Sequence, residues 1–149
     1  MLRVSKLTDY ATEVMTVLAA APARVHSAQE LAERARLEAP TVSKLLKQLA
    51  SAGLIESFRG VNGGYRLARE PARISIADIV IAMEGPIGMT ECSAQVGLCD
   101  HETHCGVRVN WQRINDAIAG ALAGVSLADM LKTPPRRRLA TIPLRVASV

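Results

Sequence analysis

The chain has 149 residues, of which 49% are hydrophobic and 21% charged, a balance typical of a soluble globular protein that can bury a core. No apolar run is long enough for a membrane span, and Asp9, Thr12 and Glu13 interrupt the N-terminal stretch that looks like an export signal, so we expect a cytoplasmic protein without a membrane partner. Aromatic residues make up only 3%, which leaves the core to aliphatic side chains and favours helices over sheets.

The net charge of +4 is unevenly distributed along the chain. Residues 1–75 hold 11 Lys and Arg against 7 Asp and Glu, whereas residues 76–133 hold 3 against 7. Residues 134–149 contain four arginines and no acid. A basic first half suits a polyanion such as nucleic acid, and the acidic middle does not.

The first half of the chain predicts three helices and a hairpin. Apolar residues at steps of three and four predict a helix over 6–21, capping residues predict a short helix over 27–36, and a third helix is expected over 40–53. The stripe of the first helix comprises Leu7, Tyr10, Val14, Leu18 and Ala21. Alternating residues at 54–59 and 65–68 flank a glycine-rich turn, which is typical of the wing that follows a helix-turn-helix.

The second half predicts helices on either side of a segment with cysteines. Ser75 caps a helix that runs through Glu84, and a longer helix is expected over 107–123. The apolar side of the longer helix suits a dimer seam and an intramolecular core equally; it comprises Trp111, Ile114, Ile118, Leu122 and Val125. Ser126 caps a final short turn.

We therefore expect a mainly α fold with a small β hairpin. A winged helix-turn-helix domain occupies 1–85, and a cysteine-rich loop without helical period occupies 86–106. Residues 107–133 supply a dimerisation helix and a short terminal helix, and residues 134–149 form a flexible basic tail.

The predicted DNA-contacting residues lie on the third helix and on the hairpin. The start of the second helix of a helix-turn-helix enters the major groove, and an arginine at a wing tip can enter the minor groove. Glycines beside it let the backbone approach phosphate. We assign DNA contacts to Thr41, Ser43, Lys44, Lys47, Arg59, Gly60, Gly63, Gly64 and Tyr65. For the residues of the third helix, the alternative is a solvated helix face without DNA contacts. Arg66, Arg69 and Arg73 are expected to contact phosphate or to be solvated charges. His26 is expected on the surface.

Cys92, Cys99 and Cys105 are separated by six and five residues in one loop-like segment. Three thiolates so close in sequence can converge on one metal centre, and thiolates favour iron–sulfur clusters or zinc. The spacing does not match the Cys-x-x-Cys pairs of common zinc sites, although His101 and His104 keep zinc open. The alternative is three unrelated thiols.

Several motifs together resemble one family, the IscR/NsrR-type iron–sulfur regulators of bacteria. They are the segments Leu7–Ala11, Gly53–Gly60 and Gly63–Tyr65 together with the cysteine triplet, and the resemblance covers residues 1–133. The first nine residues look most like the branch that regulates the SUF iron–sulfur assembly operon. The resemblance implies a homodimer of winged-helix subunits joined by the long C-terminal helix, with a cluster on the three cysteines and DNA contacts from Arg59 and the recognition helix.

The chain departs from the family at the fourth ligand. One branch uses a histidine three residues after the last cysteine, where this chain has Arg108, and the gap between the first two cysteines is one residue longer than usual. Another branch uses an aspartate from the first helix of the partner subunit, in a motif that matches Leu7–Asp9. We therefore favour Asp9 as the fourth ligand, ahead of Glu13, His104 and His101. The alternative for Asp9 is a carboxylate favoured by the helix dipole, which is worth about 0.3–1 kcal/mol.

The sequence thus predicts a homodimeric DNA-binding transcriptional regulator, not an enzyme, controlled by a two-iron or four-iron iron–sulfur cluster and regulating SUF genes. The first alternative is a winged-helix regulator whose cysteines bind zinc or sense redox state or nitric oxide. An electron-transfer protein and a DNA-binding module with incidental cysteines are further alternatives.

Overall fold

The computed structural model describes residues 3–132, so the predicted tail at 134–149 lies outside the described residues. The elements, in chain order, are α1 (Lys6–Ala19), α2 (Ala28–Ala35), α3 (Ala39–Ser51), β1 (Ile55–Phe58), β2 (Gly64–Leu67), η1 (Pro71–Arg73), α4 (Ile76–Glu84), α5 (Glu91–Ala94), η2 (Glu102–His104), α6 (Arg108–Ala123) and α7 (Leu127–Met130). The chain is mainly helical with a small antiparallel hairpin, as expected. The segment predicted as irregular contains one short α-helix, α5, and one 3-10 helix, η2.

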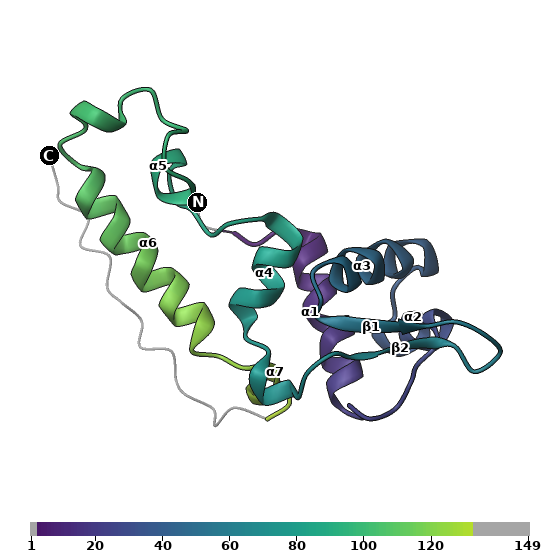
Figure 1. Cartoon of the computed structure of the whole chain (residues 1–149). Coiled ribbons are helices and arrows are strands. Elements are labelled where there is room, and N and C mark those ends of the chain that lie inside the picture. Colours follow the sequence, from purple (N-terminus) through teal and green to yellow (C-terminus); the bar gives the residue numbers. More distant parts are fainter. Residues whose placement is uncertain (1–2, 133–149) are drawn as a thin grey trace, which may run out of the picture.

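Helices α1 to α3 and the hairpin form a winged helix-turn-helix (Figure 1). Ile55 pairs with Leu67 and Phe58 pairs with Gly64 across the two strands. The core beneath is aliphatic; its fully buried side chains include Met15, Leu18, Leu31, Leu45, Leu46, Leu49, Ile74, Ile79 and Leu127. α7 closes this core, because the Leu127 N–H donates to the Ile74 carbonyl at 2.7 Å.

The buried face of α1 differs from the predicted stripe. Val14 and Leu18 are buried as expected, but Leu7 is 36% exposed and Ala21 lies beyond the end of the helix. Thr8 and Ala11 are buried instead. Small side chains face inward here because α1 packs directly against α4.

His26 was predicted on the surface, and this is wrong: its side chain is fully buried. The residue forms a two-way backbone bridge with Tyr65, with N–H···O distances of 2.9 and 2.8 Å, which draws it under the hairpin. Its Nδ1 lies 3.2 Å from a carboxylate oxygen of Glu30. That carboxylate also pairs with Arg24 at 3.0 Å. Ser27 and Glu30 have the spacing of a capping box, but only the bond from the Glu30 N–H to the Ser27 hydroxyl is formed.

Helix α6 extends from the cysteine segment (86–106) towards α7, alongside α4 (Figure 1). Asn115 is its one buried residue, and the Asn115 side-chain oxygen accepts a bond from the Met89 N–H at 3.2 Å. Trp111 and Ile114 remain 38% and 45% exposed. The apolar side of α6 is therefore not an intramolecular core, although Ile118 and Leu122 are half-buried.

The start of α1 is capped by a residue from the end of α4. Ser5 is the N-cap, and its hydroxyl accepts from the Thr8 N–H at 3.2 Å. In an ordinary capping box, the third helical residue would accept the N-cap N–H, but that residue is Thr8. The Glu84 carboxylate supplies the acceptor instead, at 2.8 Å from the Ser5 nitrogen and 2.5 Å from the Thr8 hydroxyl. These bonds join two segments 76 residues apart in the sequence.

The first prediction concerns the pH dependence of this cap. Hydrogen bonds from Thr8 and Ser5 hold the pKa of Glu84 below its ordinary value of 4.5. Ionised Glu84 therefore stabilises the fold above that value, and the contribution is lost as the pH falls through the lower, folded-state pKa. Wild type should exceed Glu84→Gln in unfolding free energy at pH 7, by no more than about 1 kcal/mol because the carboxylate is largely exposed.

Urea denaturation at pH 7 and below pH 4.5 measures the difference, which should shrink on acidification. The matched control is Glu70→Gln, an exposed glutamate without a capping side-chain bond. A wild-type advantage that persisted unchanged at acid pH would show that the charge of Glu84 has no part in the cap.

Candidate functional site

The exposed side of α3 carries most of the predicted major-groove residues. Ser43, Lys44 and Lys47 are exposed and Thr41 is half-buried, whereas Val42, Leu45, Leu46 and Leu49 are fully buried. Core packing on one side thus fixes which side chains the other side presents. Two cations one turn apart on an exposed helix face can bind phosphate or base edges.

The hairpin places Arg59 at its tip, where the side chain is exposed. Gly60 has a φ of 105°, and the Gly63 N–H closes the turn by donating to the Gly60 carbonyl at 2.9 Å. A Cβ at Gly64 would overlap the His26 carbonyl, and a Cβ at Gly63 would overlap the Phe58 carbonyl. The fold itself therefore requires glycine at positions 63 and 64, independently of any contact with DNA.

Other side chains of the hairpin are occupied by the protein itself. Tyr65 is half-buried and packs on the core, so its side chain contributes to the stability of the fold. Arg66 lies over the Phe58 ring at 4.9 Å and pairs with Glu56 at 3.0 Å. Val61, fully exposed at the tip, was not singled out from the sequence, since an apolar residue in a turn gives no local signal.

The three cysteines are free thiols in the cysteine segment, which lies at the N-terminal end of α6 (Figure 1). Cys92 is buried in α5, with its sulfur 3.3 Å from the Thr90 hydroxyl, and Cys99 and Cys105 are half-exposed. Glu102 ties the segment together: its carboxylate accepts from the Gly97 N–H at 2.6 Å and pairs with Arg108. Arg108 thus stabilises the loop through this ion pair. One branch of the IscR/NsrR-type regulators has a ligand histidine at the same position.

Within residues 3–132, no three Cys, His, Asp or Glu side chains are brought together as a metal site. The chemistry of the donors fits an iron–sulfur cluster, because cysteine thiolates are the usual ligands of such clusters. The single chain does not make them converge. The candidate histidines belong to the same segment, and His104 Nδ1 is 2.8 Å from the Thr103 hydroxyl.

Asp9 is exposed in the first turn of α1, and it lines a cavity of about 720 Å³ between α1, α4 and α6. Ile118 and Leu122 line the same cavity, as does Glu84. Ten residues of helix, about 15 Å, separate Ile118 from Arg108 at the cysteine end of α6. Asp9 therefore lies beside the C-terminal half of α6. The start of the cysteine segment, residues 86–89, lines the same cavity, but within residues 3–132 Asp9 is not brought together with the cysteines as a metal site. Glu13, one turn further along α1, is also exposed.

No helix of residues 3–132 has the length and apolar character that a bilayer span requires.

Comparison with known proteins gives a consistent result. The family model described as Rrf2, iron-dependent transcriptional regulator, matches residues 4–133. An HTH-type transcriptional regulator of Neisseria meningitidis serogroup A is 34% identical over 102 residues, which cover 68% of this chain and 68% of the relative.

Two solved structures are also similar. CymR, the global cysteine regulator of B. subtilis, is 31% identical with a TM-score of 0.69, covering 88% of this chain and 97% of that one. IscR of T. potens is 33% identical with a TM-score of 0.64, covering 87% and 86%. These relatives are transcriptional regulators, not enzymes. The chain is therefore a member of the Rrf2 family of winged-helix transcriptional regulators.

Proposed function

We propose that this regulator works as a homodimer whose affinity for operator DNA is set by an iron–sulfur cluster. Cys92, Cys99 and Cys105 bind the cluster, and Asp9 of the partner subunit is the fourth ligand. The observation that carries the proposal is the set of three free thiols on one short segment of a chain that matches an iron-dependent family. When bound by these residues, the cluster would be the cofactor that responds to iron supply, oxygen or nitric oxide.

The exposed apolar side of α6 supports the dimer. Trp111 and Ile114 lie on the same side of the helix and are 38% and 45% exposed, so this side presents apolar surface that a partner would cover. If two α6 helices pack antiparallel about a two-fold axis, the cysteine end of one lies against the C-terminal half of the other. Asp9 lies beside that half, so the same pairing explains a ligand set that one chain does not assemble.

Glu84 connects the cysteine segment to the DNA-binding helices. It is the last residue of α4, directly before Gly85 and Pro86 at the entrance of the cysteine segment, and it caps the turn of α1 that carries Asp9. A change in the segment is thereby passed to α1, against which α2 and α3 pack. A coupling of about 1–3 kcal/mol is enough for regulation.

The DNA-reading part of the proposal rests on α3 and the hairpin tip. Lys44, Lys47 and Arg59 are exposed cations that none of the ion pairs within residues 3–132 engages. Thr41 and Ser43 supply hydroxyls, Gly60 lets the tip turn, and Gly63, Gly64 and Tyr65 shape the wing. The target that we propose, the SUF iron–sulfur assembly genes, rests on the resemblance of residues 1–9.

One observation favours a second candidate. Cys99 and Cys105 are half-exposed thiols not brought together with a third ligand in residues 3–132, and a similar structure is named as a cysteine regulator. In this alternative the cysteines bind zinc, or act as a thiol redox or nitric oxide sensor without a cluster.

Arg59→Ala tests the wing. Loss of a guanidinium that enters the minor groove should weaken operator binding by about 1–3 kcal/mol at fixed salt and leave the visible spectrum of the protein unchanged. Fluorescence anisotropy over a salt series measures it. Lys132→Ala, which removes an equal charge at the end of α7, is the control and should bind normally. Unaltered affinity for Arg59→Ala would refute the wing assignment.

Ile114→Glu tests the dimer. A carboxylate buried in a helix seam without a partner is strongly unfavourable, so sedimentation should give a monomer for the variant and a dimer for wild type. The control Ala123→Glu adds the same charge at an exposed position that points away from Ile114 on the same helix. If both variants sediment as wild type, α6 is not the seam.

Iron and acid-labile sulfide analysis tests the cluster. Protein purified without oxygen should contain both, with visible absorption, and Cys99→Ala should lose both. Asp9→Ala should lose the cluster faster than wild type on exposure to a chelator, and Glu13→Ala should not. Absence of iron and sulfide even after reconstitution would contradict the cluster; stoichiometric zinc in its place would support the alternative.

A further inference from the structure

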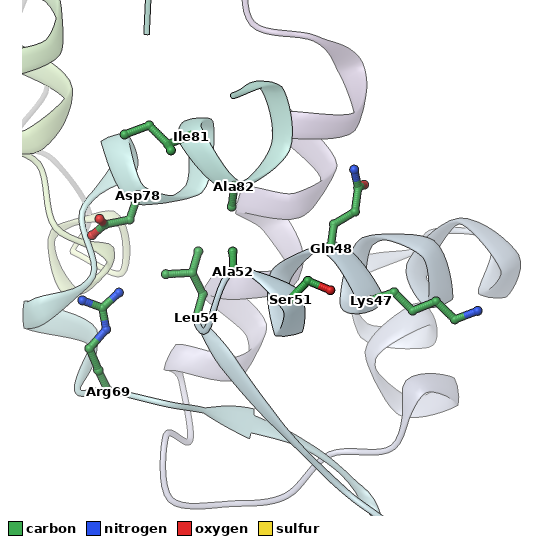
Figure 2. A pocket seen from close by; sticks show the side chains of 9 residues that line it. All are labelled: Lys47, Gln48, Ser51, Ala52, Leu54, Arg69, Asp78, Ile81 and Ala82. Atoms are coloured by element: carbon green, nitrogen blue, oxygen red, sulfur yellow. The ribbon is translucent and has the colours of Figure 1, made fainter. Parts of the chain in front are cut away.

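A groove of about 630 Å³ lies behind the recognition helix, between the C-terminal half of α3, the ends of the hairpin and α4 (Figure 2). It is distinct from the cavity beside Asp9, with which it shares no residue. Leu54, at the start of the wing, and Ala82 of α4 give it an apolar wall. A volume of this size is in the range of small-molecule sites.

One end of the groove carries two opposite charges that do not pair. In Figure 2 the Arg69 guanidinium points toward the Asp78 carboxylate, yet no ion pair joins Arg69 to any acid in residues 3–132. Asp78 is held in place, because its Oδ2 accepts from the Ser75 N–H at 2.8 Å and from the Ser75 hydroxyl at 3.0 Å. A fixed carboxylate facing an unpaired guanidinium is complementary to a molecule that carries both charges on neighbouring atoms.

A third polar group lines the groove further along α3. The Gln48 Oε1 is buried and has no hydrogen-bond partner within the described protein. Buried acceptors are nearly always satisfied, and an orphaned one calls for a donor. Figure 2 places Gln48 at the opposite end of the groove from Arg69 and Asp78. A ligand with a long side chain that extends along the apolar wall would supply the donor for Gln48.

From these three features we propose that the groove binds a free α-amino acid with a long polar side chain. Its carboxylate pairs with Arg69, its ammonium group with Asp78, and its side-chain donor with Gln48. The walls of the groove are α3 and both ends of the hairpin, so the bound amino acid fixes the recognition helix relative to the wing. The amino acid is then a second signal, independent of the cysteine segment.

Calorimetric titration of the full chain with L-glutamine, L-lysine and L-arginine tests this, because their side-chain donors reach progressively further from the α-carbon. We expect saturable binding of at least one of them with a Kd of about 1 mM or below. Its Nα-acetyl derivative, which lacks the α-ammonium group, and its α-carboxamide, which lacks the carboxylate, should bind at least about tenfold more weakly, since each leaves one charge unpaired.

The matched variants are Arg69→Gln and Arg73→Gln. Both arginines are exposed and close in sequence, but only Arg69 lines the groove. Arg69→Gln should lose binding while keeping its melting temperature, and Arg73→Gln should bind as wild type. The proposal is overturned if none of the three amino acids binds saturably, if Arg69→Gln binds as wild type, or if the N-acetyl derivative binds equally well, which would indicate an anion site only.

Discussion

The packing of α6 is the constraint on which the rest of this structure depends. The helix is anchored to its own chain at buried Asn115, and it leaves Trp111 and Ile114 in contact with water. Its N-terminal end follows the last cysteine, whereas Asp9 lies beside its C-terminal half. Within residues 3–132, a single chain thus neither covers the apolar side of α6 nor assembles a set of metal ligands. Pairing of two α6 helices, as we propose, completes both at once, because an antiparallel pair covers the apolar side and brings each cysteine segment to the partner's first helix.

A polar contact at a helix start then connects the two halves of the molecule. Glu84 contributes the acceptor that the first turn of α1 lacks, so the entrance of the cysteine segment and the start of the winged-helix domain share hydrogen bonds. Such bonds have a modest net free energy, which suits a regulatory element better than a rigid one. Gly85, with a φ of 89°, lets the chain turn away directly after Glu84.

Local signals were enough to predict most of the fold. The Ser75 and Ser126 capping boxes are formed as expected with Asp78 and Asp129, and the hairpin and helices α2 to α4 lie within a few residues of their predicted ranges. The features that sequence reasoning missed depend on contacts between distant segments. The burial of His26 follows from its bridge to Tyr65, the cap of α1 from Glu84, and the glycine at position 64 from the carbonyl of His26. The cysteines were correctly placed in one segment, but their spacing does not reveal that, within residues 3–132, one chain does not bring them together with Asp9 as a metal site.

We propose that the state of the cysteine segment decides how the dimer binds DNA. The most direct test compares the Kd for one operator fragment between cluster-loaded protein and the same preparation after the cluster has been removed by a chelator, at identical salt. If the cluster controls binding, the two Kd values should differ by about 5–150-fold, the range of an ordinary coupling free energy. Equal affinities of the two forms for every fragment that either form binds would contradict it.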